Sequence, residues 1–364
     1  MEKGRNTMLF SGRSPRALLP LSMITLSLAI AAVLCCAGCS SLESVSPDIP
    51  ADPFLCEKEG DGRDIFDTSF TPDLRVCLPS IDGKSLNIST RADAWRLIRR
   101  LDLFVFDPDG IRALDSYTRS YAYSPYSVSV PSASGDKLVV AVANRDFPDE
   151  EVTAIHCYED LKATVVELTG DHPSWPVMSG ETRFVAGKGH SCSITLEPMM
   201  STVEIHSLRC RMEGPYTGQS LRRVKVYLTG ISNRAELLRG SGFLPAETLN
   251  NGGLSETDLK RLAYSGMVYR YLGDGRDSDG GTEYGTAALY CYPNESGEES
   301  PGSPFTKLVI EGELDGKTRY YTIPVNRGSD DGQTGIGRNR RYVFDLTIRG
   351  PGTESPDDIT LFQP

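Results

Sequence analysis

Histidine and cysteine are the residues of this chain best suited to nucleophilic or metal chemistry, and their spacing argues against both. The sequence has four histidines, and His156 is followed directly by Cys157. A histidine activates a cysteine only when the two side chains meet. Adjacent residues on a strand point to opposite faces, so this pair is poorly placed for proton transfer. We therefore predict no catalytic residue and no enzymatic activity.

A second group with possible chemistry is the acidic stretch Asp274–Gly280, which contains three aspartates. Calcium loops need oxygen ligands at fixed alternate positions and a closing glutamate. The first acidic spacing differs here, and no glutamate closes the loop. We interpret the stretch as a flexible acidic loop, with a calcium loop as the weaker alternative. No metal site and no cofactor are predicted.

The most informative cysteine is Cys39, at the end of an apolar N-terminal run. The first sixteen residues carry four basic side chains and one acidic one, and the apolar core Leu18–Leu34 follows. This core is at the lower limit of length for a membrane-spanning helix, which favours a cleaved signal. Ala37 and Gly38 are the small residues that a signal peptidase requires. We predict residues 1–38 as a lipoprotein signal peptide, with an uncleaved anchor as the alternative.

Acylation of Cys39 would hold the mature chain at a membrane. Each buried methylene contributes about 0.8 kcal/mol, so several acyl chains make release very slow. The next residue is Ser40, whereas inner-membrane retention signals typically have aspartate there. The predicted location is therefore the cell outer membrane, with the protein lipid-anchored and surface-exposed.

Six further cysteines would enter an oxidising compartment after export. An even number permits disulfides in 15 connectivities, and the absence of a Cys-x-x-Cys pair makes a zinc site improbable. For Cys192 and Cys210, buried thiols on strands are an equal alternative. The six residues are Cys56, Cys77, Cys157, Cys192, Cys210 and Cys291.

Composition predicts a mostly β protein that does not bind nucleic acid. The net charge is −11, whereas phosphate backbones require clustered lysine and arginine. The chain contains 35 glycines, 23 prolines and 16 tyrosines, with many short runs of valine, isoleucine, leucine and tyrosine. Short apolar runs separated by turn residues are typical of β-strands.

The apolar runs form two groups that meet near Pro198. In the first group, Leu101–Phe106 precedes strong turn residues and Lys137–Ala143 fits a central strand, while Asp160–Leu168 is predicted as a surface helix. In the second group, Arg341–Arg349 is the final long strand. We predict four parts: the signal peptide, a flexible tether at 39–55, and β domains at 56–198 and 199–364.

Several motifs, in this order, resemble the fimbrillin-associated anchor proteins of Bacteroidales. They are the signal ending at Cys39, "LDLFVFDPDG" at Leu101–Gly110, "PVMSG" at Pro176–Gly180 and "RNRRYVFDLTIRGPG" at Arg338–Gly352. The resemblance implies two tandem transthyretin-like β-sandwich domains after a lipoprotein signal peptide. It also implies an outer-membrane lipoprotein that anchors a type V fimbria, limits its length and has fimbrial stalk subunits as partners.

The mechanism that the resemblance implies is strand donation. A protease removes the first strand of a stalk subunit, and a neighbour's C-terminal strand fills the groove by pairing its backbone with both sides. An anchor keeps its first strand and lipid, so growth stops. Residues 350–364 are the possible donor tail here, and its apolar strand is Ile359, Thr360, Leu361 and Phe362. The alternative is a tail that folds back as an edge strand.

Two other functions stay open on the sequence. Cleavage at Arg91, Arg96, Arg99 or Arg100 would make the chain a minor or tip fimbrial subunit. A surface glycan-binding lipoprotein is the competing class, because Trp95, Trp175 and the Tyr121-Ala122-Tyr123 stretch could contact a sugar.

The acylation site gives the first testable prediction. Metabolic labelling with palmitate should mark the wild-type protein and be lost in Cys39→Ala, because the acyl chains need this thiol. Labelling that persists in the variant would show that Cys39 is not the lipidated residue.

Overall fold

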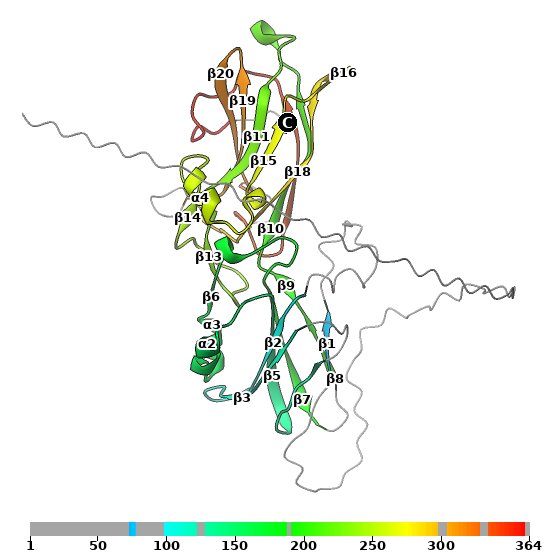
Figure 1. The fold of residues 1–364 in the computed structure, drawn as a ribbon, viewed down its shortest axis with the longest axis vertical. Helices are drawn as coiled ribbons and strands as arrows, with labels where there is room; N and C mark the ends of the chain where they lie inside the picture. Colours follow the sequence, from blue (N-terminus) through cyan, green and yellow to red (C-terminus); the bar gives the residue numbers. More distant parts are fainter. Residues whose placement is uncertain are drawn as a thin grey trace, which may run out of the picture. The chain divides into compact units, whose positions relative to one another are not determined.

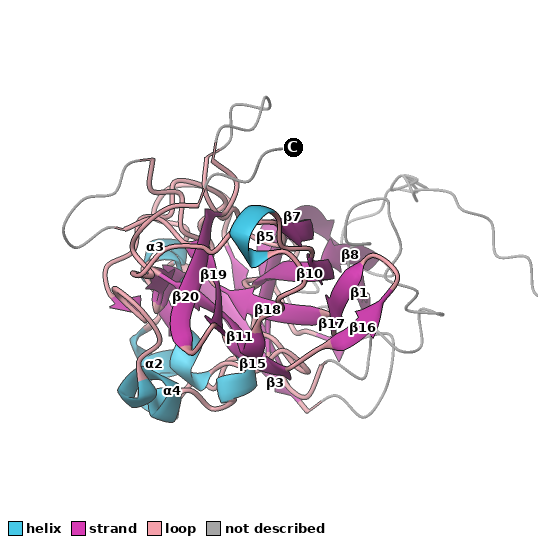
Figure 2. Ribbon diagram, turned by 90° about the horizontal axis from the view of Figure 1, so that it is seen from above, coloured by secondary structure: helices cyan, strands magenta, loops and turns pink. Residues whose placement is uncertain are grey.

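The computed structural model describes residues 73–77, 98–121, 128–187, 191–297, 304–327 and 334–360. These residues belong to one compact unit of the chain and are mostly β (Figure 1). The α-helices among them are short (Figure 2): α2 (Asp149–Ala154), α3 (Tyr158–Lys162) and α4 (Glu256–Arg261).

The first half of the chain is built on a five-stranded antiparallel sheet in the order β3-β2-β5-β7-β9. Its strands are β3 (Leu114–Ser120), β2 (Leu101–Phe106), β5 (Gly135–Ala143), β7 (Met178–Ala186) and β9 (Glu197–Pro198). All of β2 is buried, as are the last seven residues of β5. Both predicted strands are confirmed, and they are buried because the sheet is covered on both faces.

A small three-stranded sheet covers one of these faces. It has the order β4-β1-β8, and β1 pairs antiparallel with β4 and parallel with β8. Figure 1 shows β1 (Asp73–Cys77) beside β8 (Ser191–Thr195). In the strand order, β4 (Val128–Ser129) lies on the other side of β1. Leu103 and Val105 of β2 belong to the apolar cluster under this small sheet, together with Ile194 of β8.

The alternate residues of β2 belong to a second and much larger cluster. Phe104 and Phe106 pack there with Tyr158 of α3, and Phe147 meets Phe104 edge-on at a ring distance of 5.5 Å. This alternation follows from the two-residue period of a strand. One strand therefore contributes to two apolar cores.

The second half consists mainly of two facing sheets. One joins β16, β17, β10 and β18, and β21 pairs with β10; the other has the order β15-β11-β19-β20. Their strands are β10 (Ser201–Cys210), β11 (Arg222–Thr229), β15 (Tyr269–Gly273), β16 (Arg276–Ser278), β17 (Gly281–Tyr284), β18 (Ala287–Cys291), β19 (Lys307–Leu314), β20 (Lys317–Pro324) and β21 (Arg341–Ile348).

The two halves share backbone and side-chain contacts. Strand β13 (Arg234–Glu236) of the second half pairs with β6 (Val165–Glu167) of the first, and the large apolar cluster contains residues of both. A second short pair joins β12 (Ile231–Ser232) and β14 (Thr248–Leu249). The predicted division at Pro198 falls between β9 and β10.

The predicted helix Asp160–Leu168 is wrong beyond its first turn. α3 ends at Lys162, and β6 occupies the positions where the helix was expected to continue. Val165 and Val166 are β-branched and lose rotamer freedom in a helix. Pairing with β13, a strand far away in the sequence, decides the conformation of this stretch.

Gly180 in β7 gives a prediction about the packing of the first half. A Cβ atom at this position would lie 2.0 Å from the Thr195 carbonyl oxygen of β8. Gly180→Ala should therefore cost about 2 to 3 kcal/mol in the free energy of unfolding, because backbone atoms must move apart. Urea denaturation measures the loss, with Gly170→Ala as a control, since a Cβ at Gly170 meets nothing within 4 Å. Equal stability of the two variants would contradict the close approach.

Candidate functional site

The predicted site residues fall partly within the structure. Cys39 and the last two donor residues, Leu361 and Phe362, lie outside the described residues. Ile359 and Thr360 are described, and Ile359 forms an isolated parallel bridge with β20 while remaining 43% exposed. The acylation site thus stays a prediction.

Residues 350–360, called the C-terminal segment below, run along the edge strand β20. Thr353 and Tyr320 exchange both of their backbone hydrogen bonds, at 2.9 and 3.0 Å. The Thr360 amide donates to the Thr322 carbonyl at 2.9 Å, and the Thr322 amide donates to the Thr360 hydroxyl at 3.2 Å. The segment therefore satisfies edge groups of β20 that would otherwise face solvent or a partner.

The C-terminal segment also lies over the outer face of this sheet. Tyr227, Val309 and Thr322 form a row across β11, β19 and β20, and each is at most 1% exposed. The Thr322 hydroxyl donates to the Pro356 carbonyl at 2.8 Å, which places the segment over this row. Burial raises the pKa of Tyr227 well above its ordinary value. Release of the segment would expose apolar and aromatic surface.

The other strand-pairing surface is the outer edge of β21. The Thr202 amide donates to the Arg340 carbonyl, and the Arg211 amide donates to the Ile348 carbonyl. The N–H and C=O groups of even-numbered residues in β21 therefore point toward β10. Odd-numbered residues, such as the 49% exposed Val343, turn theirs to the opposite edge. Within the described ranges no strand pairs with that edge. Tyr342 and Phe344 pack against the core but remain only partly buried, as expected beside an open edge.

The arginine run that precedes β2 is described only at its end. Arg91 and Arg96 lie outside the described residues, whereas Arg100 donates to Asp102 at 2.7 Å and to the Phe147 carbonyl at 3.0 Å. The Arg100 side chain is 13% exposed, and Asp102 is fully buried. A trypsin-like protease must take the arginine side chain into its own pocket. These contacts therefore protect the bond after Arg100.

Arg99 is also engaged, and its partner bears on glycan binding. The Arg99 guanidinium carbon lies 3.2 Å from the centre of the Trp175 ring, and the His172 ring stacks parallel to Trp175 at 3.9 Å. Both faces of the indole are thus covered, and no face is left for a sugar ring. Trp95 lies outside the described residues, and Tyr121 is 62% exposed.

His156 and Cys157 do not act on each other. The Cys157 thiol donates to the Asp160 carboxylate at 3.3 Å, and the same carboxylate accepts the backbone amides of His156 and Cys157. These hydrogen bonds lower the pKa of Asp160 and begin α3. The pair has a structural role at a helix N-terminus.

The acidic stretch Asp274–Gly280 is a β-hairpin and not the flexible loop that we predicted. β16 pairs with β17, the Asp274 carboxylate accepts the Arg223 amide at 2.7 Å, and Asp277 accepts the Thr282 hydroxyl at 3.2 Å. Two of its aspartates are thus held by protein donors. Over the part of the chain that the structure describes, no group of three histidine, cysteine or acidic residues could hold a metal ion.

Cys157, Cys210 and Cys291 are unpaired thiols. Cys210 and Cys291 are buried, and burial raises the pKa of Cys291 to about 12. For Cys210 the buried-thiol alternative is therefore correct. Among the described residues, no helix is long and apolar enough to cross a membrane.

Sequence reasoning missed a buried carboxylate between the two halves. Asp171 is 3% exposed, and it accepts the amides of His172 and Val177 at 2.7 and 3.0 Å. Its second oxygen accepts the Tyr292 hydroxyl at 2.9 Å, from 121 residues further along the chain. Burial raises the pKa of Asp171 to about 6. No local pattern marks this aspartate, because its phenol partner is distant in sequence.

No family model and no curated protein matches the chain. Among solved structures, a fimbrilin from Porphyromonas gingivalis W83 is similar with a TM-score of 0.56 at 16% identity, over 79% of this chain and 92% of that one. A proposed cell adhesion protein from Bacteroides eggerthii DSM 20697 has a TM-score of 0.56 at 15% identity, over 83% and 94% of the two chains. A third, from Parabacteroides distasonis ATCC 8503, has a TM-score of 0.52 at 15% identity, over 81% and 92%.

These likenesses show the fold. The predicted mostly β fold is confirmed: the chain has several antiparallel sheets in a fimbrilin-like arrangement. At such identities the role of each relative does not transfer with the fold.

Asp171 gives a pH prediction. In the folded state its pKa is about 6, above the ordinary 3.8. Between pH 3.8 and pH 6 the folded state therefore binds more protons than the unfolded state. Stability should fall by roughly 3 kcal/mol from this group as pH rises from about 4 to 6, since each pKa unit corresponds to 1.36 kcal/mol. Asp171→Asn should remove this dependence in urea unfolding measured from pH 4 to 7.

The control for that experiment is Asp136→Asn, which changes an exposed aspartate. It should keep the wild-type pH dependence. A wild-type slope in Asp171→Asn would mean that another group titrates in this range.

Proposed function

We propose that this protein anchors a type V fimbria to the outer membrane through acyl chains on Cys39 and limits the length of the fibre. The fimbrilin-like fold is the observation that carries the proposal. The lipoprotein signal before Cys39 supplies the membrane attachment, and fimbrial stalk subunits are the partners. The proposed location is the cell surface, at the base of the fibre.

The position of β1 supports the role of a terminator. β1 is the middle strand of the small sheet, with β4 on one side and β8 on the other. While β1 stays in place, a donor strand finds no open groove beside β8. A chain that keeps β1 therefore offers no place for further growth there.

Whether β1 stays in the small sheet depends on whether the chain is cut in the arginine run between β1 and β2. Cleavage in the arginine run would separate β1 from β2, leaving it held only by strand pairing. The contacts of Arg99 with Trp175 and of Arg100 with Asp102 oppose cleavage after these two arginines in the folded chain. An uncut chain keeps both its first strand and its lipid, as an anchor requires.

The C-terminal segment is the proposed donor to a stalk subunit, and donation has a cost. Ile359 and Thr360 would have to leave β20. This would break the hydrogen bonds with Thr322 and expose the row of side chains that includes Tyr227 and Val309. A partner groove must offset this loss with new backbone pairs and apolar contacts. The open edge of β21 offers stalk subunits a second surface for strand pairing.

The second candidate is a minor or tip fimbrial subunit, which shares the fold and differs in processing. The N-terminus of surface-purified protein separates the two roles. An acylated Cys39 supports the anchor, whereas an N-terminus beyond Cys56 supports a polymerising subunit. A glycan-binding role is weakened by the covered faces of Trp175.

Electron microscopy tests the anchoring role. Cells lacking the protein, or carrying Cys39→Ala, should release long fibres into the medium, because growth is not stopped and the base is not held. Cys35→Ala, in the predicted signal peptide, is the matched cysteine control and should keep fibres of normal length on the cell. Fibres of normal length that stay attached in the deletion strain would refute the proposal.

A further inference from the structure

A partly buried arginine, Arg338, spans the contact between the two halves of the chain. It lies in a turn three residues before β21. Its guanidinium donates to the carbonyls of Glu197 and Pro198 in β9, at 2.6 and 3.3 Å, and to the Leu237 carbonyl at 3.0 Å. It also donates to Ser179 of β7, to the hydroxyl at 2.8 Å and to the carbonyl at 3.3 Å.

The hydrogen-bond acceptors of Arg338 are four backbone carbonyls and one hydroxyl. Carbonyl dipoles stabilise a buried cation less than a carboxylate would, and burial lowers the pKa of Arg338 to about 10. The side chain therefore remains charged at neutral pH and needs all of these dipoles. The nearby Glu197 carboxylate raises the Arg338 pKa in part, but the direct hydrogen bonds come from the four carbonyls and the hydroxyl. A partly desolvated charge is stable only where such acceptors are held in place.

The acceptors exist together only when the first half is folded. Ser179 and Glu197 are register partners in the β7–β9 pair, and Leu237 follows β13, which pairs with β6. The Ser179 hydroxyl also donates to the Leu237 carbonyl at 2.8 Å. Separation of these strands would break the hydrogen bonds that Arg338 makes in the folded chain.

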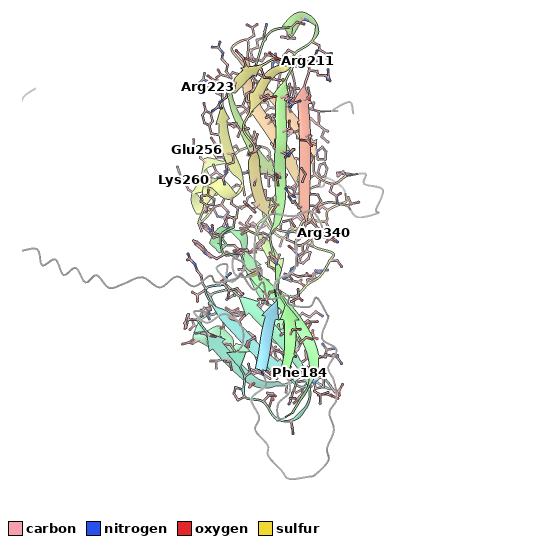
Figure 3. All side chains as sticks on the ribbon, turned by 90° about the vertical axis from the view of Figure 1, so that its right-hand side faces the viewer. Phe184, Arg211, Arg223, Glu256, Lys260 and Arg340 are labelled. Atoms are coloured by element: carbon pink, nitrogen blue, oxygen red, sulfur yellow. The ribbon has the colours of Figure 1, made fainter. Side chains whose placement is uncertain are left out.

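The chain on either side of Arg338 is hydrogen-bonded to the start of β10, just before β21 begins. The Arg340 amide donates to the Ser201 hydroxyl at 2.9 Å, and this hydroxyl donates to the Gly337 carbonyl. Figure 3 shows Arg340 at the beginning of β21. Hydrogen bonds of Arg338 and of its neighbours Gly337 and Arg340 thus link β7 and β9 of the first half to the start of β10.

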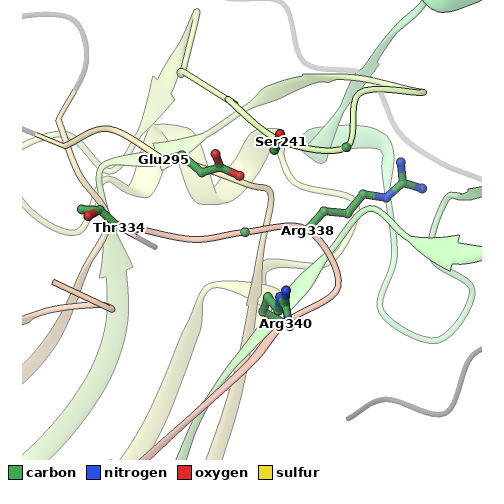
Figure 4. Close-up of a pocket in the computed structure, with 8 residues that line it drawn as sticks. Ser241, Glu295, Thr334, Arg338 and Arg340 are labelled. Atoms are coloured by element: carbon green, nitrogen blue, oxygen red, sulfur yellow. The ribbon is translucent and has the colours of Figure 1, made fainter. Parts of the chain in front are cut away.

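The hydrogen bonds of Arg338 are not directed into the pocket beside it. A pocket of about 340 Å³ is lined by Glu295, Thr334, Arg338 and Arg340, with Ser241 and three glycines. Figure 4 shows the Arg338 side chain extending away from Thr334 and Glu295. Most of its hydrogen bonds go to Ser179, Glu197 and Pro198 of the first half, so its role lies in the contact between the halves.

We propose that Arg338 couples the two halves so that they unfold as one cooperative unit. Asp171–Tyr292 and the β6–β13 pair cross the same contact. Arg338 differs from them because it donates to three carbonyls of the first half, those of Ser179, Glu197 and Pro198. The coupling itself does not depend on the proposed function. Its mechanical consequence rests on that function, because in an anchor a force between the lipid and the fibre would act on both halves together.

Unfolding of the full chain, purified in detergent, can be followed separately in each half. The only tryptophans, Trp95 and Trp175, lie in the first half, so their fluorescence reports its unfolding. Cys210 and Cys291 are buried in the second half, and pulsed alkylation read by mass spectrometry reports when they become exposed. In the wild type the two urea midpoints should coincide.

Arg338→Met should separate the two midpoints by at least about 0.5 M urea, because the variant loses the hydrogen bonds that Arg338 makes between the halves. The control is Arg349→Met, which removes an arginine paired with Glu213 at the surface and should leave both midpoints coincident. Coincident midpoints in Arg338→Met, even if both are lower, would overturn the proposal.

If Arg338→Met does not fold, Ser179→Ala serves as a milder variant. It removes one acceptor of Arg338 and leaves the carbonyls in place. Its midpoints should separate in the same direction by a smaller amount, and coincidence in this variant would likewise overturn the proposal. Failure of the anchoring role in cells would leave this coupling result unaffected.

Discussion

Pairing at the edges of β-sheets is the constraint on which the rest of this structure depends. An edge strand presents unpaired N–H and C=O groups that can bind any extended chain of suitable shape. Here β1 fills the place between β4 and β8, and residues 350–360 satisfy part of the edge of β20. In a protein that assembles by strand exchange, these are the strands whose retention or release decides whether another subunit can join.

The contact between the two halves of the described chain is the second constraint. The large apolar cluster includes residues from both halves, and the β6–β13 pair carries backbone hydrogen bonds across. The buried Asp171 and the partly buried Arg338 have polar partners there, and hydrogen bonds restrict the geometry more narrowly than apolar contacts do. Apolar surfaces can slide, whereas a buried charge tolerates only the arrangement that satisfies it.

Local pattern predicted the strands well and one helix badly. β2, β5 and β21 carry continuous or alternating apolar residues, and their bounds agree with the predicted ranges to within two residues. The stretch after Lys162 failed because its conformation depends on β13, and a window of a few residues contains no information on a distant partner. The acidic stretch at 274–280 failed for the same reason, since pairing with β17 makes it a hairpin.

The sequence by itself determined the β class and located the main strands along the chain, and it led to two predictions, a lipid site at Cys39 and no enzyme chemistry. These depend on composition, alternation and short motifs, which are local properties. Only the tertiary structure decided that β1 lies between β4 and β8 and that Thr360 lies on β20. It also decided that Arg338 donates hydrogen bonds to carbonyls of β7 and β9. Such contacts join residues that are distant in the chain, and their stability arises from burial and hydrogen bonding that exist only after folding.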